Sequence, residues 1–105
     1  MDVKIVRLTS GEEIICQFES RGDKNFLKNP AVLIPSPEGK LLLARWLPYA
    51  DVEDGVELEV RHFVFVVPAQ KQLEDHYMNV VVNNLVIPGK SLINPLDSSN
   101  LKLTV

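Results

Sequence analysis

The sequence has almost no cysteine and no long apolar run. Cys16 is the only cysteine in 105 residues, so an internal disulfide is excluded and a reducing compartment is favoured. No apolar stretch approaches the roughly 20 residues that cross a bilayer. The first residues, Met-Asp-Val-Lys, lack the basic region and apolar core of a signal peptide. These absences predict a cytoplasmic protein with no membrane partner.

Positive charge is also scarce. The net charge of −3 argues against indiscriminate binding to a polyanion. The segment 51–59 is acidic and has no lysine or arginine, whereas the segment 21–28 leans basic through Arg21, Lys24 and Lys28. Any nucleic-acid site must therefore be local, created by geometry or by repetition around an oligomer. The acidic segment is either a solvated loop or a complementary patch for a neighbouring subunit.

Motifs for catalysis and for metals are missing as well. His62 and His76 fall in different predicted elements, with no nucleophile placed beside either imidazole. No Walker loop, dinucleotide fingerprint or zinc spacing is present. The acidic segment misses the spacing of a calcium loop, because Gly55 comes one place early. We therefore expect a protein that binds rather than catalyses, with no cofactor and no metal.

What the sequence does contain is the pattern of one antiparallel β domain. Its length suits a single modest core, and 46% hydrophobic residues are ordinary for a globular chain. Runs rich in β-branched and aromatic residues predict strands. These strands are expected at 3–8, 13–18, 29–34, 40–49 and 57–67, with turns at 9–12, 35–39 and 51–55 and a mobile polar loop at 19–28. Gly11 suits a positive φ in the first turn.

The stretch 57–67 organises this prediction. Alternation places one set of side chains, Leu58, Val60, His62, Val64 and Val66, on one face of a strand. The other face then carries Glu57, Glu59, Arg61, Phe63, Phe65 and Val67. The second half of the stretch is apolar on both faces, so each face must be shielded from water by another part of the protein. Either a helix or another subunit supplies that second cover.

A helix is expected after Pro68, which ends the strand. Apolar residues recur at helical spacing over about 69–83. The competing interpretation is a strand from 80 to 87, because the β-branched run at 80–82 disfavours helix. We expect residues 1–88 to form the β domain, including this helix, and residues 89–105 to form a C-terminal tail. Its last segment, 101–105, is either loose or an edge strand.

Six polar residues are candidates for a nucleic-acid site. Arg61, predicted on the wet face of the strand, would stack on a base or pair with phosphate, or form a cross-strand salt bridge. Asn25 and Asn29 suit a base edge, although turn and cap chemistry is favoured. Lys24 and Lys28 would hold phosphate or simply be solvated. The sixth is His62, for which the pattern favours a hydrogen-bonded core histidine.

Two further residues invite more than one reading. Trp46, in an apolar strand with Tyr49, would stack on bases or lie in the core or an interface, and the latter is favoured. Cys16 shares a face with Ile14 and Phe18, which predicts a small buried hydrophobe rather than a nucleophile.

Three segments carry a resemblance to a known family. Five bent antiparallel strands resemble the Sm and Sm-like (Lsm, Hfq-type) proteins, which form RNA-binding rings. The segments Leu-Thr-Ser-Gly-Glu-Glu-Ile-Ile-Cys at 8–16, Leu-Lys-Asn-Pro at 27–30 and Trp-Leu-Pro-Tyr-Ala at 46–50 look like a cyanophage and marine-metagenome family of Sm-like proteins. This resemblance covers most of residues 3–88, and it would place the chain in a phage host's cytoplasm.

The resemblance implies roles for several positions. Gly11 falls on the turn glycine of the first Sm motif, Asn29 on its base-reading asparagine, and Asn25 stands where that motif has aspartate. Arg61 matches the arginine of the second motif, and His62 replaces the glycine that follows it. In Sm-like rings the fourth and fifth strands of adjacent subunits pair, which would bury an open strand edge.

The sequence as a whole therefore predicts a strongly bent five-stranded antiparallel Sm-like barrel with a C-terminal helix. Our leading hypothesis is a ring of about five to seven identical subunits that binds single-stranded RNA or DNA. RNA is favoured, in phage RNA or DNA processing. The predicted interface residues are Phe63, Phe65, Val67 and Trp46. The alternatives are a structural or protein-interaction ring that binds no nucleic acid, and a monomeric barrel covered entirely by its own helix.

Overall fold

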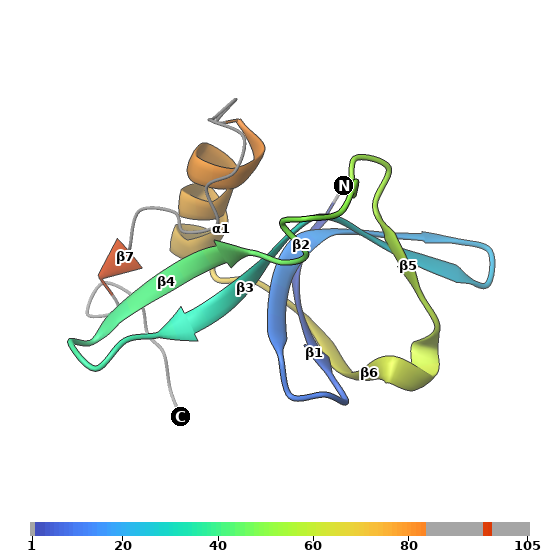
Figure 1. Ribbon diagram of the computed structural model, residues 1–105, viewed down its shortest axis with the longest axis horizontal. Coiled ribbons are helices and arrows are strands. Elements are labelled where there is room, and N and C mark those ends of the chain that lie inside the picture. Colours follow the sequence, from blue (N-terminus) through green and yellow to red (C-terminus); the bar gives the residue numbers. More distant parts are fainter. Residues whose placement is uncertain (1, 84–95, 98–105) are drawn as a thin grey trace.

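The computed structural model describes residues 2–83 and 96–97 and shows a mainly antiparallel β fold with one helix near the end of the chain (Figure 1). The strands are β1 Asp2–Leu8, β2 Glu13–Arg21, β3 Lys24–Pro35, β4 Lys40–Arg45, β5 Val56–Leu58, β6 Phe63–Pro68 and β7 Leu96–Asp97. A 3-10 turn covers Val60–His62, and helix α1, Lys71–Tyr77, continues as a π turn at Met78–Val82.

All seven strands belong to one sheet. Its order is β6-β1-β2-β3-β4-β7, and β5 lies off this path on β3. The long β3 therefore has two successive partners: residues 31–35 pair with β4, and residues 25–27 pair with β5. β4 and β5 together act as one antiparallel partner of β3 that the segment 46–55 interrupts. When these two pieces are taken as one strand, β1 to β6 give the predicted five strands, and the two-residue β7 is an additional one. Among the described residues, however, no pairing joins β5 to β6, so hydrogen bonds do not close the sheet into a barrel.

The first two predicted strands are present, and the turn between them has Gly11 at φ 101°. The prediction of a mobile loop at 19–28 is wrong. β2 and β3 extend into this segment and pair from Arg21 with Lys24, so that only Gly22 and Asp23 remain as the turn. Gly22 has φ 63° there, a conformation that glycine adopts without strain. The predicted strand at 40–49 is too long, because β4 ends at Arg45.

The predicted continuous strand at 57–67 is wrong too. β5 pairs with β3, whereas β6 pairs with β1, and these two partners lie on opposite sides of β2. A straight strand cannot pair with both, so the chain crosses between them through the 3-10 turn. The peptide N–H of His62 donates to Glu59 O at 3.0 Å in this turn, and the His62 carbonyl accepts from Thr9 N at 2.9 Å.

This break overturns the predicted faces. Val60, His62 and Val64 are exposed rather than directed inward. The register of β1 with β6 shifts between Arg7 and Leu8, so that Val64 is left without a partner residue. Because of this bulge, Phe63 and Val66 both face the interior although they are three residues apart.

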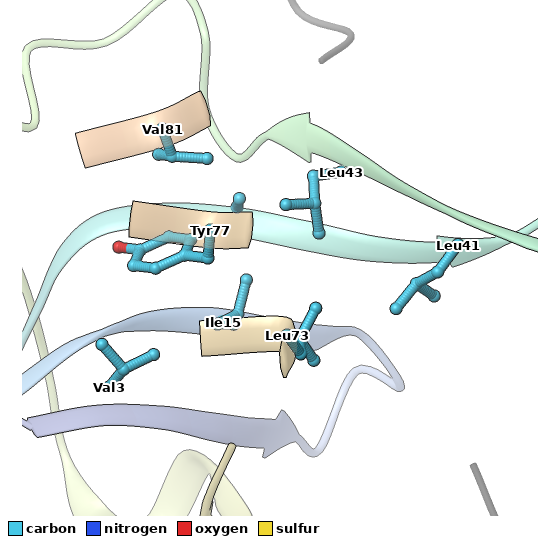
Figure 2. Packing of buried hydrophobic residues seen from close by; sticks show 8 residues of the cluster. Val3, Ile15, Leu41, Leu43, Leu73, Tyr77 and Val81 are labelled. Carbon is cyan, nitrogen blue, oxygen red and sulfur yellow. The ribbon is translucent and has the colours of Figure 1, made fainter. Parts of the chain in front are cut away.

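Two hydrophobic clusters lie on opposite faces of the sheet. The helix-side cluster contains Val3, Ile15, Ala31, Leu41, Leu43, Leu73, Tyr77 and Val81, and Figure 2 shows its helix residues lying against the strands. The barrel-side cluster contains Val6, Leu8, Ile14, Cys16 and Leu27, with Phe18, Trp46, Leu58, Phe63 and Val66 packed against it. Figure 1 shows β5, the 3-10 turn and β6 arching around on the side away from α1. The predicted burial of Cys16 on the face of Ile14 and Phe18 is confirmed.

The predicted helix is confirmed in position, although it starts at Lys71 and its last part is a π turn. The competing strand is wrong for residues 80–82, which belong to that turn. The predicted boundary at residue 88 and the segment 101–105 lie outside the described residues. Of the tail, Leu96 and Asp97 pair with Leu41 and Lys40 of β4. No helix within the described part of the chain is long and apolar enough to span a membrane.

Candidate nucleic-acid interface

The two candidate lysines lie on the hairpin of β2 and β3. Lys24 pairs with Arg21 and Lys28 pairs with Gln17, so both lysines lie on the same face of the hairpin as Ile15 and the helix. Lys28 Nζ is 3.9 Å from Glu19 Oε1, and Lys24 is exposed at the tip.

Phe26 and Arg21 share this hairpin face and form a stacked pair. The Arg21 guanidinium carbon lies 4.3 Å from the centroid of the Phe26 ring, within the range of a cation–π contact. The same guanidinium donates to both oxygens of Glu19, at 2.8 and 3.2 Å. These hydrogen bonds lower the pKa of Glu19 and raise that of Arg21. The spacing of apolar residues in the sequence could not predict this pair, because the pair is held together by charge pairing and stacking.

Asn25 and Asn29 take different structural roles. The Asn25 side chain accepts from Ser20 Oγ at 2.9 Å. Asn29 sits where the register of β2 with β3 shifts, with φ 49°, and its Nδ2 donates to Gln17 Oε1 at 2.7 Å. Asparagine tolerates this left-handed conformation better than most residues. Asn29 thus lies in a β-bulge within β3 and not in the turn or cap that the sequence favoured.

The helix holds this bulge in place. Tyr77 Oη donates to Asn29 O at 2.6 Å and lies 3.3 Å from Lys28 O. Burial raises the pKa of Tyr77, so its hydroxyl stays protonated and remains a donor. The irregular register leaves carbonyl oxygens of β3 outside the β ladder. The Tyr77 hydroxyl, which comes from the helix, serves as their hydrogen-bond partner.

Arg61 and His62 lie in the exposed 3-10 turn. The Arg61 guanidinium contacts the Glu59 carboxylate, with Nε–Oε2 at 3.1 Å, and both side chains are about two-thirds exposed. This carboxylate comes from the same turn, not from the neighbouring strand that the sequence suggested. His62 borders a hollow of about 230 Å³ together with Thr9, Ser10 and Glu12.

The six candidate residues are thus only partly brought together. Asn25 pairs with Leu58, so the 3-10 turn begins at the same end of the sheet as the β2–β3 hairpin. Lys24 and Lys28 face the helix side, whereas Asn25 pairs with Ser20 on the barrel side. No contact joins Arg61 to Asn29 among the described residues.

The four predicted interface residues divide into two pairs. Phe63 packs edge-on against Phe18, with ring centroids 5.9 Å apart. The Trp46 Nε1–H donates to Glu12 Oε2 at 3.0 Å, and its ring packs against the barrel-side cluster. The chain itself covers much of Phe63 and Trp46. By contrast, Phe65 and Val67 keep 36% and 40% of their surface exposed.

The buried thiol of Cys16 takes no part in this surface. Burial raises its pKa from 9.0 to about 12, which keeps the sulfur neutral and unreactive. Within the part of the chain that the structure describes, no group of histidine, cysteine, aspartate and glutamate could hold a metal ion. No protein-family model matches the sequence, and no curated protein matches it.

Proposed function

We propose that this chain is the subunit of an Sm-like ring of about five to seven copies. The ring binds single-stranded nucleic acid, RNA in preference to DNA, and acts by binding rather than by catalysis. The open edge of β6 is the observation that supports this proposal most strongly.

β6 is an edge strand with an apolar surface. It hydrogen-bonds to β1 on one side, and among the described residues no strand pairs with its other side. Val64 is 59% exposed, and Phe65 and Val67 follow it. An exposed apolar edge of this kind is a template for pairing with another chain. A sister subunit would satisfy the free peptide groups and shield these side chains together.

The charge of the other free edge favours a head-to-tail contact. Among the strands that the structure describes, β5 pairs only with β3, and Glu57, Glu59 and the acidic loop before them are exposed there. A symmetric β5-to-β5 contact would place carboxylates opposite one another, which is unfavourable. Pairing β6 of one subunit with β5 of the next avoids this repulsion. Such a contact repeats around an axis and can close into a ring.

Repetition would compensate for weak individual sites. A single chain offers only a few cations on the hairpin and the 3-10 turn, against a net charge of −3. In a ring these groups recur at fixed spacing, and a bound strand can engage several copies at once. Asn25 and Asn29 would contact bases, Arg61 and His62 would meet the strand at the turn, and Lys24 and Lys28 would attract phosphate.

A ring that binds only proteins is the second candidate. The observation in its favour is that Arg61 and Arg21 already pair with carboxylates of their own chain. A phosphate must displace Glu59 before it reaches the Arg61 guanidinium. The two candidates agree on assembly and differ only in the response to an oligonucleotide.

Assembly is tested by the mass of the purified full-length protein in light scattering, compared with 11.8 kDa for one chain. We expect the wild-type assembly to have the mass of five to seven chains. We expect Val67→Lys to form a much smaller assembly. Val60→Lys is the matched control, because Val60 is 71% exposed but lies in the 3-10 turn. A wild-type mass of one chain would contradict the ring.

Nucleic-acid binding is tested by fluorescence anisotropy with short oligouridylate and with DNA of the same length. We expect binding that weakens steeply as salt rises, because phosphate contacts release counterions. No binding at low salt, with the ring intact, would leave the protein-interaction ring as the function.

A further inference from the structure

A small hollow lies where β3, the segment after β4 and the π turn meet. Its volume is about 70 Å³, and its walls include Asn29, Pro30, Arg45, Trp46, Leu47 and Val81. One water occupies about 30 Å³ of liquid, so the hollow admits a group of a few heavy atoms. It is separate from the larger hollow beside His62, with which it shares only Trp46.

Backbone irregularities gather around this hollow. Within the described residues, Asn29 and Leu47 are the two non-glycine residues with positive φ, at 49° and 59°, and both border it. A bulky residue such as leucine is rarely found there, and strain of this kind clusters at ligand sites. Val81 comes from a π turn, another irregularity that is frequent at functional sites.

Arg45 also lines the hollow, and no described residue supplies a counter-charge for it. Arg7, Arg21 and Arg61 each pair with a carboxylate, on Glu13, Glu19 and Glu59 respectively. Arg45 is the one remaining arginine of the four in the chain, and it is half-buried. Across residues 2–83 and 96–97, its guanidinium has no hydrogen bond and no ion pair.

Arg45 continues a line of cations on one face of the sheet. It pairs with Ala31, which belongs to the helix-side cluster. Lys28 pairs with Gln17, whose side chain accepts from the Asn29 amide. Arg45, Asn29 and Lys28 therefore lie on the helix side of β3, and Lys24 follows at the hairpin.

We propose that this hollow binds a phosphate group through Arg45. The guanidinium presents a planar set of donors that matches an oxyanion, and the second N–H of the Asn29 amide adds a donor. This inference rests on the proposed function when the phosphate belongs to a nucleic-acid strand. The strand would then follow the helix side of β3, from the hollow past Lys28 to Lys24.

Three variants of the full-length protein test the site. Arg45→Gln removes the charge, Arg45→Lys keeps the charge without the planar donors, and Lys40→Gln removes a charge at the other end of β4. We expect Arg45→Gln to weaken oligouridylate binding about tenfold and to reduce the salt slope by about one. The affinity of Arg45→Lys for oligouridylate should lie between those of Arg45→Gln and the wild type. The affinity of Lys40→Gln should stay within about twofold of the wild type. Circular dichroism confirms that each variant folds.

A second readout separates the source of the phosphate. The Arg45 Nε–H signal in nitrogen-15 spectra is followed during titration with oligouridylate and with inorganic phosphate. If oligouridylate binds but Arg45→Gln behaves like Lys40→Gln, the site is refuted while the proposed function stands. If only inorganic phosphate shifts the signal, the site stands and the proposed nucleic-acid function fails. If neither shifts it and Arg45→Gln instead dissociates the ring, carboxylates of a second copy occupy the hollow and the site is refuted.

Discussion

Two apolar regions of the sheet differ in how completely the chain itself covers them. On the helix side, α1 and the π turn cover the strands, and Leu73 and Tyr77 are fully buried. The β6 strand lies at an open edge, where Val67 pairs with Ile5 and Phe65 with Arg7. Both side chains are therefore on the helix-side face of the sheet, but they remain partly exposed. The helix does not cover Phe65 or Val67. The helix-covered region is shielded from water within a single chain. At the β6 edge, an additional chain would bury the most apolar surface.

Truncating one residue from each region should give the largest contrast. Leu73→Ala should destabilise the chain by about 3 kcal/mol, because it leaves a cavity in a closed core. Val67→Ala should cost about 0.5 kcal/mol in the isolated chain, because its side chain is already partly in water. Urea denaturation at low protein concentration measures both. Equal losses would show that Val67 is as well shielded from water as Leu73.

Raising the pH should destabilise the chain through both hydrophobic clusters. Cys16 lies in the barrel-side cluster and Tyr77 in the helix-side cluster, and burial raises the pKa of each group. A raised folded-state pKa stabilises the protein below the unfolded-state pKa, and that stability is lost as the pH rises. For Cys16 the loss begins near 9.0 and continues to about 12.

At pH 10 the combined loss should be about 1–2 kcal/mol relative to pH 7. Urea denaturation at several pH values measures it, with Cys16→Ala and Tyr77→Phe removing one titrating group each. In the folded state at neutral pH, a thiol reagent should modify Cys16 slowly. Rapid modification without unfolding would contradict the burial.

Tyr77→Phe tests how far the helix stabilises the bulge of β3. The variant keeps the ring in the helix-side cluster but removes the hydroxyl that donates to Asn29 O. We expect a loss of about 1–2 kcal/mol, because a partly buried carbonyl loses its partner. Thermal unfolding measures the loss, and Phe18→Leu in the other cluster shows the effect of changing packing alone. A change below about 0.3 kcal/mol would mean that water replaces the hydroxyl.

Two substitutions of Asn29 separate its backbone role from its side-chain role. Asn29→Ala should destabilise by about 1 kcal/mol, because alanine pays a steric cost at positive φ. Asn29→Gly should be less destabilising, since glycine adopts this conformation freely. If the amide contacts a strand, both variants should bind oligouridylate equally weakly. Weak binding by Asn29→Ala alone would assign the residue a purely structural role.

Arg61→Ala should have the smallest effect on stability. Its ion pair with Glu59 is exposed on both sides, and such pairs contribute about 0–1 kcal/mol. We expect weaker oligonucleotide binding with the ring mass unchanged. Glu59→Gln is the informative counterpart, because it frees the guanidinium and should strengthen binding. Unchanged affinity in both variants would remove the 3-10 turn from the binding surface.

The parts of the fold that follow apolar periodicity could be predicted from the sequence. The face shared by Ile14 and Cys16, the turn at Gly11 and the helix after Pro68 all depend on local patterns, and all are present. The hairpin beyond Phe18 has no apolar period. It is held by ladder pairing, the Ser20–Asn25 hydrogen bond and the charges around Glu19.

The break between β5 and β6 shows a second limit. Alternation continues through Val60 and His62 in the sequence, although the chain leaves one neighbour strand for another at that point. Which strands lie on either side is a property of the whole sheet, so a local pattern cannot report it. The same holds for Arg45, whose significance comes from what surrounds it. Arg45 and Asn29 border the same hollow only because the fold brings β3, β4 and the π turn together.

The division of one strand into β4 and β5 has a practical consequence. Both pieces are anchored independently to β3, and the segment between them ends in an exposed turn at Glu53 and Asp54, closed by the Gly55 N–H donating to Val52 O at 3.0 Å. Extra residues spliced in at that tip would leave the register on either side unchanged. The molecule thus carries an exposed position in the middle of the sequence for a reporter peptide or an affinity tag.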